Sequence, residues 1–274
     1  MKKINRRSFL AAAGLTAAAL ALTACGGSAS STASSTASSA AVSTSAAAEL
    51  TTVEAGKLTM ATNATFPPYE MTTDSGEIEG IDVDTAKAIA EKLGLELQID
   101  DMEFDAALLS VQQGKADIVM AGVTVTDERK AVMDFSDSYA TGIQSIIVPN
   151  DSDIASPDDL AGKKIGTQRG TTGYIYCSDD FGEDSVVAYD SGLTAVQALN
   201  NGQVDAVVID NAPATEYVAA NPGLKVLDTS YAEEDYAIGM AKGSALEDAV
   251  NKALEELKAD GTLQAIVDKY INAN

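Results

Sequence analysis

Polar residues that could bind a small charged molecule follow several predicted strands of this sequence. They lie in residues 63–69, 121–129 and 168–173 and at Asp210. The guanidinium of Arg129 offers a planar fork of N–H donors that matches a carboxylate, and the carboxylate of Asp210 can accept from an ammonium group. These residue types favour the binding of a small polar molecule at a shared rim.

Helices and strands alternate along the body of the chain, and this order positions the polar segments. Apolar spacing with Gly and Pro punctuation predicts helices at 84–93, 106–113 and 193–200, a helix start at Ser156-Pro157-Asp158, and strands at 95–99, 116–120, 164–167 and 205–209. Asp105 and Ser191 are expected to cap the second and third of these helices. Such alternation implies a largely parallel sheet covered on both faces, with ligands beyond the carboxyl ends of its strands.

An internal echo predicts two lobes of similar build. Residues 108–120 and 196–208 both show a helix end, two amides, a glycine, two spacer residues, an aspartate and an apolar strand. A coincidence of βαβ punctuation is the alternative. The first lobe is expected at 57–143 plus 240–274, where helices within 244–271 cover it, the second at 149–234, and the hinge crossings at 144–148 and 235–239. A ligand cleft would lie between the lobes.

Composition and charge exclude several kinds of function. The chain carries 41 Asp and Glu residues against 18 Lys and Arg, a formal net charge of −23, which makes nucleic acid a poor partner. Histidine is absent, and the sequence has no Walker loop, no Cys-His pair and no metal-ligand cluster beyond scattered carboxylates. We therefore expect neither catalysis nor a metal or other cofactor, with a carboxylate pair acting as acid and base as the enzymatic alternative.

The N-terminus resembles an export signal followed by a lipid-attachment site. Basic residues within 2–7 precede an apolar run at 9–22 that is too short to span a bilayer. Leu22-Thr23-Ala24-Cys25 resembles the bacterial lipoprotein box, so residues 1–24 would be a signal peptide and Cys25 the lipidated new N-terminus. An ordinary signal with an incidental cysteine is the alternative, and the pair Arg6-Arg7 leaves the export route, general or twin-arginine, open.

Residues 25–56 are expected to form a flexible tether. Gly26 to Ala48 contain only Gly, Ser, Ala, Thr and one Val, with no charge. Such a stretch cannot bury enough apolar surface to fold. The folded part is expected to start near Lys57.

Short blocks in the body resemble a known family. Gly80-Ile81-Asp82-Val83-Asp84 with Ala86–Ala90, Phe104-Asp105-Ala106, Thr124–Arg129 and Phe135-Ser136 occur in the family's order, although Thr85 stands where an aliphatic residue is usual. From Lys57 to Tyr270 the chain is similar to the polar amino-acid-binding proteins of ABC importers, the family 3 solute-binding proteins. The resemblance implies an α/β, two-lobed periplasmic-binding-protein-like fold of type II, with the ligand cleft between the lobes.

The resemblance also implies which residues bind the ligand. Arg129, with backbone N–H groups near Thr124 and Thr172, would bind the α-carboxylate of a free amino acid, and Asp210 of the opposite lobe would bind its α-ammonium. The zwitterion would bridge the cleft and favour closure. The remaining expected contacts are Asn63, Phe66, Phe104, Ala121, Gly122, Gln168 and Thr171.

Side-chain selection is expected from residues around the rest of the ligand. By the resemblance, Phe66 and Phe104 flank the ligand side chain, while Asn63 and Gln168 sense its polarity. Relatives that bind cationic amino acids often place a carboxylate where Asn63 stands, which favours an uncharged polar ligand such as glutamine. An acidic ligand is the alternative, because Arg169 stands beside Gln168.

Each of these residues also has a purely structural interpretation. Arg129 could be an exposed helix charge paired with Asp127 or Glu128, and Asp210 could be a helix cap. The corresponding interpretations are core aromatics for Phe66 and Phe104, cap or surface residues for Asp82 and Asp84, and a buried small hydrophobe for Cys177.

Taken with the N-terminus, the resemblance implies a monomeric lipoprotein at the outer face of the bacterial cytoplasmic membrane, which is the cell surface where there is a single membrane. It would capture a free amino acid and hand it to ABC permease subunits. A ligand-sensing surface lipoprotein and a dehydratase-type enzyme on the same scaffold are the alternatives.

Overall fold

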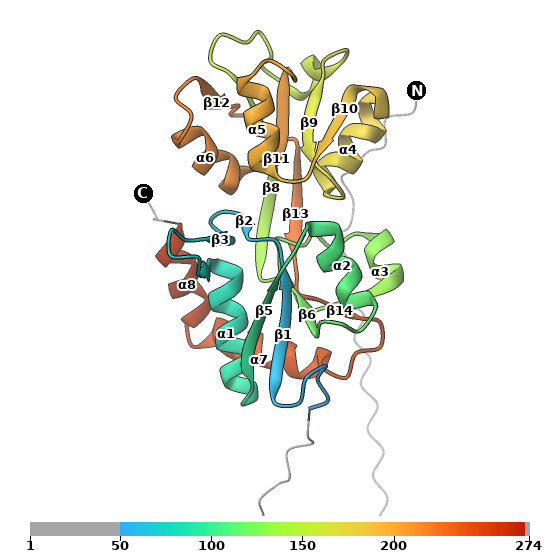
Figure 1. Ribbon diagram of the computed structural model, residues 1–274, viewed down its shortest axis with the longest axis vertical. Coiled ribbons are helices and arrows are strands. Elements are labelled where there is room, and N and C mark those ends of the chain that lie inside the picture. The colour runs from blue at the N-terminus through green and yellow to red at the C-terminus, as the bar shows by residue number, and fades with distance from the viewer. Residues whose placement is uncertain (1–49, 272–274) are drawn as a thin grey trace, which may run out of the picture. The chain divides into compact units, whose positions relative to one another are not determined.

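The computed structural model describes residues 50–271, which form two α/β lobes, each built on its own sheet (Figure 1). The predicted signal peptide, Cys25 and the tether up to residue 49 lie outside the described residues. The helices are α1 (Ile81–Leu93), α2 (Phe104–Gln112), α3 (Asp127–Val132), α4 (Thr172–Phe181), α5 (Gly192–Asn200), α6 (Asn211–Ala219), α7 (Glu247–Ala259) and α8 (Thr262–Tyr270), with 3₁₀ turns η1 (Pro157–Leu160) and η2 (Glu183–Ser185). The strands are β1 (Lys57–Thr62), β2 (Thr65–Phe66), β3 (Glu70–Thr72), β4 (Ile78–Glu79), β5 (Glu96–Asp101), β6 (Ile118–Val119), β7 (Met133–Phe135), β8 (Ala140–Pro149), β9 (Ile165–Gln168), β10 (Val186–Tyr189), β11 (Ala206–Asp210), β12 (Leu224–Val226), β13 (Ala232–Tyr236) and β14 (Gly239–Ala241).

The first sheet has the strand order β5-β1-β6-β14-β7 and helices on both faces. Successive residues of β1 point to opposite faces. Leu58 and Met60 therefore belong to the core under α1, α7 and α8, whereas Ala61 belongs to the core under α2. The C-terminal helices pack on this sheet, as their apolar spacing predicts, through Leu246, Val250, Leu254 and Leu257.

The second sheet has the order β10-β9-β11-β8-β12 and the same alternation. Val207 and Ile209 of β11 pack with α5 and α6, while Ala206 and Val208 pack on the other side against α4. Cys177 of α4 is buried in the core on the α4 side of this sheet, which confirms its interpretation as a small hydrophobe.

The strands β8 and β13 join the two sheets (Figure 1). They pair antiparallel from Gln144↔Ala232 to Ala140↔Tyr236, while the second half of β8 pairs with β11 and β12. By sheet membership the chain therefore leaves the first sheet between β7 and β8, and returns between β13 and β14. The predicted crossing at 144–148 falls inside β8, because its apolar run continues the ladder of the second sheet.

Strand direction differs in part from the expected parallel sheet. The pairs β1-β5, β1-β6, β9-β10 and β9-β11 are parallel, as alternating helices and strands predict. Every pair made by β8 or β14 is antiparallel. These strands carry the chain between the sheets without a crossover helix, so they enter from the opposite end.

The internal echo corresponds to one repeated structural device. Gly114 and Gly202 end α2 and α5 with positive φ angles of 65° and 67°. Asp117 then accepts a hydrogen bond from the amide of Thr59, and Asp205 accepts one from the amide of Lys164. In each lobe this aspartate ties a helix turn to the start of the neighbouring strand, so the echo is not a coincidence of punctuation.

Two local predictions need correction. Asp105 lies in the first turn of α2 and Glu103 is its N-cap, because the helix begins at Phe104. The packed region also starts before Lys57: Leu50 packs on the first core, and the amide of Val53 donates to Asp117 at 2.7 Å. Ser191 caps α5 as predicted, through the amide of Thr194.

Candidate ligand-binding site

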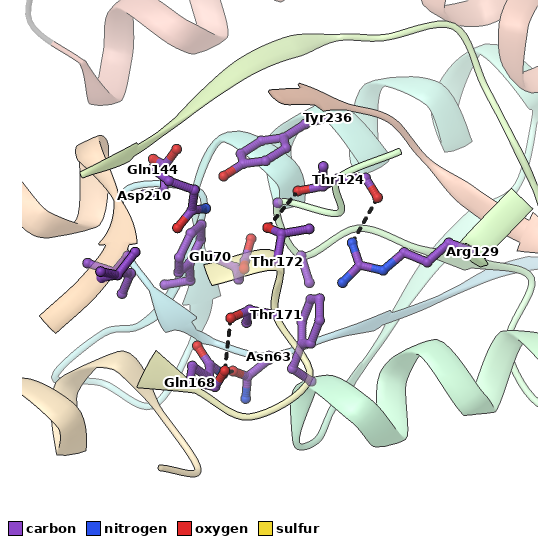
Figure 2. A pocket seen from close by; sticks show the side chains of 16 residues that line it. Asn63, Glu70, Thr124, Arg129, Gln144, Gln168, Thr171, Thr172, Asp210 and Tyr236 are labelled. Carbon is purple, nitrogen blue, oxygen red and sulfur yellow. Dashed lines mark hydrogen bonds between the residues drawn. The ribbon is translucent and has the colours of Figure 1, made fainter. Parts of the chain in front are cut away.

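A cavity that encloses about 450 Å³ of space, part of it open to solvent, lies where strands of both sheets end (Figure 2). The structure brings all the predicted contact residues to its wall, namely Asn63, Phe66, Phe104, Ala121, Gly122, Thr124, Arg129, Gln168, Thr171, Thr172 and Asp210. It adds five that the sequence analysis missed, which are Glu70, Gln144, Val208, Ile209 and Tyr236. Their contact with a ligand remains a prediction.

Arg129 is buried in this wall, with 8% of its surface exposed. The hydroxyl of Thr126 caps α3 by accepting from the Arg129 amide, which fixes the start of the short helix. Nη1 donates to the carbonyl of Thr124 at 2.8 Å, and the guanidinium lies 5.4 Å from the ring centroid of Phe104. The interpretation as an exposed charge paired with its helix neighbours is therefore wrong.

The guanidinium retains donors for a ligand. Nη1 and Nη2 each donate one hydrogen bond to a backbone carbonyl, and guanidinium has five N–H groups. Burial lowers the pKa of Arg129, while the nearby carboxylate of Glu234 raises it. The pKa of an arginine guanidinium lies so far above 7 that Arg129 stays charged at neutral pH, and the cavity therefore contains a fixed cation.

Asp210 reaches the cavity from the second sheet, at the end of β11. Its Oδ1 accepts from the amide of Ala212 and so caps α6, while Oδ2 accepts from the amide of Ile143 at 2.7 Å. The pKa of Asp210 is raised to about 6, because the effect of burial exceeds the lowering effect of the two amide donors and of the Tyr236 hydroxyl. The carboxylate is therefore mostly ionised at neutral pH. Its role as a helix cap, foreseen as the structural alternative, leaves lone pairs free for a ligand.

Direct hydrogen bonds cross the cleft around the cavity. Gln168 donates from Nε2 to Oδ1 of Asn63 at 2.8 Å, and Arg129 donates from Nη2 to the carbonyl of Gly170 at 3.2 Å. The hydroxyls of Thr124 and Thr172 lie 3.4 Å apart. Side chains of the first lobe thus contact the second at several points, which is the arrangement of a closed cleft.

The α4 N-terminus supplies polar groups to the same wall. Thr171 caps this helix by accepting from the amide of Tyr174, and Thr172 is its first residue. Backbone N–H groups at a helix start favour negative charge. An α-carboxylate held by Arg129 would lie near this helix end, because Arg129 already contacts Gly170.

Gly122 is a position where only glycine fits the wall. Its φ is +55°, and a Cβ would lie 2.8 Å from Cε1 of Phe66. The amide of Gly122 donates to Asp82 at 3.0 Å, and Tyr139 donates to the same carboxylate at 2.7 Å. Asp82 is fully buried, so its interpretation as a cap or surface residue is wrong: α1 begins at Ile81, which turns Asp82 inward.

Phe66 and Phe104 are both core residues and cavity walls. Phe104 belongs to the core under α2 and is 6% exposed. Phe66 stacks on Tyr69 with ring centroids 5.7 Å apart and also packs against the second lobe's core. The core interpretation is confirmed for these two rings, and their contact with a ligand side chain stays a prediction.

Glu70 is the most consequential residue that the sequence analysis missed. It is fully buried at the start of β3 and lines the cavity. Burial and the neighbouring carboxyl of Asp82 raise the pKa of Glu70 well above its usual range. Two adjacent buried carboxyls do not both ionise easily, so a positive charge brought next to this pair would be stabilised. The turn Pro67-Pro68 was the only sequence signal near it.

Charge around the cavity is more negative than one zwitterion requires. Glu234 of β13 accepts from the Thr124 hydroxyl and from Nε2 of Gln144, each at 3.0 Å. Among the described residues, Glu234 beside Arg129 and Asp210 across the cavity give two carboxylates against one guanidinium, and Glu70 adds a further carboxyl group to the cavity wall. This arrangement favours a ligand with extra positive charge.

Within residues 50–271, no group of three or more carboxylate or cysteine side chains is placed to hold a metal ion. The same range contains no helix long and apolar enough to cross a bilayer. What the cavity offers chemically is a cation and carboxylates on facing lobes, with aromatic walls and amide side chains between them.

Comparison with known proteins shows the family. Residues 58–273 match the sequence profile of the bacterial extracellular solute-binding proteins, family 3. The chain belongs to this family. Family 3 proteins are extracellular or periplasmic solute-binding proteins rather than enzymes, and the relatives of this chain include amino-acid-binding proteins of ABC transporters.

Three relatives illustrate how far the family likeness extends. A probable histidine-binding protein of Neisseria gonorrhoeae is 34% identical, over 97% of this chain and 96% of its own length. The arginine-, lysine-, histidine-binding protein ArtJ of Geobacillus stearothermophilus has a TM-score of 0.76 at 35% identity, covering 80% of this chain and 96% of its own. An ancestral arginine-binding protein bound to glutamine has a TM-score of 0.74 at 42% identity, covering 79% and 98%. The two-lobed fold predicted from the sequence is thereby confirmed.

Proposed function

We propose that this family 3 protein captures a polar amino acid outside the cytoplasmic membrane and delivers it to the permease of an ABC importer. The observation that carries the proposal is the meeting of Arg129 and Asp210, from opposite lobes, in one buried cavity. A free amino acid carries a carboxylate and an ammonium group on one carbon. The two side chains match these two charges.

Closure follows from the same geometry. Arg129 lies on α3 of the first lobe, and Asp210 ends β11 of the second, so a zwitterion satisfies both charges only when the lobes are together. Binding would shift the equilibrium toward the closed form by its differential affinity for the two forms. The hydrogen bonds between Gln168 and Asn63 and between Arg129 and Gly170 complete that form.

The ligand side chain is the finer part of the proposal. The surplus of carboxyl groups supports a cationic side chain such as that of arginine, which would place a positive charge beside the buried carboxyl of Glu70. The relatives also include proteins named for arginine, lysine and histidine.

Glutamine, the expectation from the sequence, is the second candidate. Its support is the amide pair of Asn63 and Gln168, which lines the cavity and can hydrogen-bond an amide side chain. A protonated Glu70 could donate to the ligand's amide oxygen. The relative solved with glutamine is itself named an arginine-binding protein, so one such cleft holds both ligands.

A thermal-shift screen of the purified protein against the twenty amino acids and cystine tests the proposal. At a ligand concentration 100 times Kd, binding to the folded form adds about 2.7 kcal/mol. For a body of this size that corresponds to a rise in melting temperature of about 5–10 °C. We expect arginine to give the largest rise and glutamine a smaller one. No rise with any amino acid would refute the proposed function.

A further inference from the structure

One hydrogen bond outside the cavity joins the two lobes. Tyr217 of α6 donates its hydroxyl to the carbonyl oxygen of Thr65 in β2 at 2.5 Å. Tyr217 is not part of the cavity wall and is only 7% exposed. The strand β2 belongs to the small sheet β2-β3-β4, which contacts α1 of the first lobe.

The tyrosine ring is held firmly in the second lobe. It belongs to the core of β11, α5 and α6, and a Cβ at Gly192 would lie 3.3 Å from its Cε2. Its hydroxyl therefore has a fixed position relative to the second sheet. Separation of the lobes would therefore move Thr65 away from this hydroxyl.

The partner segment is seated on the same surface. Phe66, the residue after Thr65, packs against the second-lobe core that contains Tyr217. It also lines the cavity. The strand β2 also contacts α5. Residues 65–66 therefore contact the second lobe directly, Thr65 through the Tyr217 hydroxyl and Phe66 through the core around Tyr217.

We propose that Tyr217 is a closure latch, a positioning residue that prolongs the retention of a captured amino acid without touching it. The proposal rests on the proposed function of the cleft. Separation of the lobes breaks the bond between the Tyr217 hydroxyl and Thr65, so the bond stabilises the closed form alone. A ligand meets the open form first, so the latch acts on dissociation more than on association.

The variant Tyr217→Phe removes the hydroxyl and keeps the ring and its apolar contacts. Stopped-flow measurement with arginine should show koff raised about two- to tenfold, the scale of one hydrogen bond, with kon changed less than about twofold. The matched control is Tyr231→Phe. The Tyr231 hydroxyl donates to Asp180 at 2.7 Å within the second lobe, so its loss should leave koff unchanged.

A second readout needs no ligand and separates failure of the latch from failure of the proposed function. Fluorophores at positions 87 and 197, exposed sites on α1 and α5, report the distance between the lobes. Without amino acid, Tyr217→Phe should lower the ratio of closed to open molecules about two- to tenfold relative to wild type. An unchanged ratio overturns the latch, as does a koff for Tyr217→Phe equal to that of wild type or of Tyr231→Phe. Absence of amino-acid binding by the wild type refutes the proposed function instead.

Discussion

Replacement of Arg129 by alanine is the perturbation with the most definite expected outcome. The side chain is buried, donates to the carbonyls of Thr124 and Gly170, and lies over the ring of Phe104. Its removal would leave a ligand carboxylate in the cavity with no cation opposite it. It would also delete one of the hydrogen bonds that cross the cleft.

The magnitude follows from the number and kind of interactions lost. Truncating one partner of a buried, hydrogen-bonded charge pair costs about 2–5 kcal/mol. With about 1.4 kcal/mol for each tenfold change, the Kd for the amino acid should rise between about 30-fold and several-thousand-fold. The loss of the bond to Gly170 disfavours closure and moves the value toward the upper end.

Isothermal titration calorimetry of wild type and Arg129→Ala with the best amino acid measures this change. Arg169→Ala is the matched control, because Arg169 lies in the segment next to Gly170 but its side chain is 57% exposed. Its loss should change Kd less than threefold, since exposed ion pairs contribute about 0–1 kcal/mol. Equal affinities of Arg129→Ala and wild type would refute the role given to the guanidinium.

Three further predictions concern other groups of the protein. Because burial raises the pKa of Asp210 to about 6, this carboxyl binds more protons in the folded than in the unfolded protein between about pH 4 and 6, so its contribution to stability falls as pH rises through that window. The affinity for the amino acid should change in the opposite direction and decrease as pH falls below 6, by up to about tenfold per pH unit. Calorimetry of Asp210→Asn should show weak binding without this pH dependence. A wild-type affinity that does not change between pH 7 and pH 5 would contradict this prediction. Glu70→Gln should weaken arginine binding about tenfold or more and change glutamine binding less than threefold. The control Glu77→Gln, at an exposed site near β3, should change neither affinity. An equal loss of affinity for both ligands would show that Glu70 does not select the ligand side chain. Cells fed labelled palmitate should label the wild-type chain and not Cys25→Ser, and a labelled variant would place the lipid elsewhere.

The residues at strand ends could be predicted because simple rules place them. Parallel strands of one sheet end at the same rim, which predicts Asn63 at the rim of the first sheet and Gln168 and Asp210 at that of the second, and the family resemblance implies that the two rims face each other. The repeated helix turn with its glycine and aspartate also had a direct structural cause, the tie from Asp117 and Asp205 to the neighbouring strand.

The missed residues come from elements whose partners lie far away in the sequence. Gln144 and Tyr236 reach the cavity on β8 and β13, which were expected only as short crossings, because local pattern does not show that Ala140–Pro149 continues a ladder with β11. Glu70 was missed because a charged residue after a turn is usually exposed. Its burial comes from the packing of β3 against β2, β4 and α1, which the local sequence pattern does not show.

The family likeness indicates the class of ligand, whereas the residues of the cavity bear on which ligand of that class is bound. The likeness over residues 58–273 establishes an amino-acid-binding family, whose members are named for different ligands. The residues of the cavity wall are the basis for the ligand that we propose for this chain, and Glu70 and Asn63 are the pair to which we attribute the preference.

The central claim is that one zwitterion is held between Arg129 and Asp210. A crystal structure of the protein with arginine tests it most directly. We expect the α-carboxylate within hydrogen-bond distance of the Arg129 guanidinium and the α-ammonium within hydrogen-bond distance of the Asp210 carboxylate. An amino acid bound in the reverse orientation, or outside the cavity, would contradict the account.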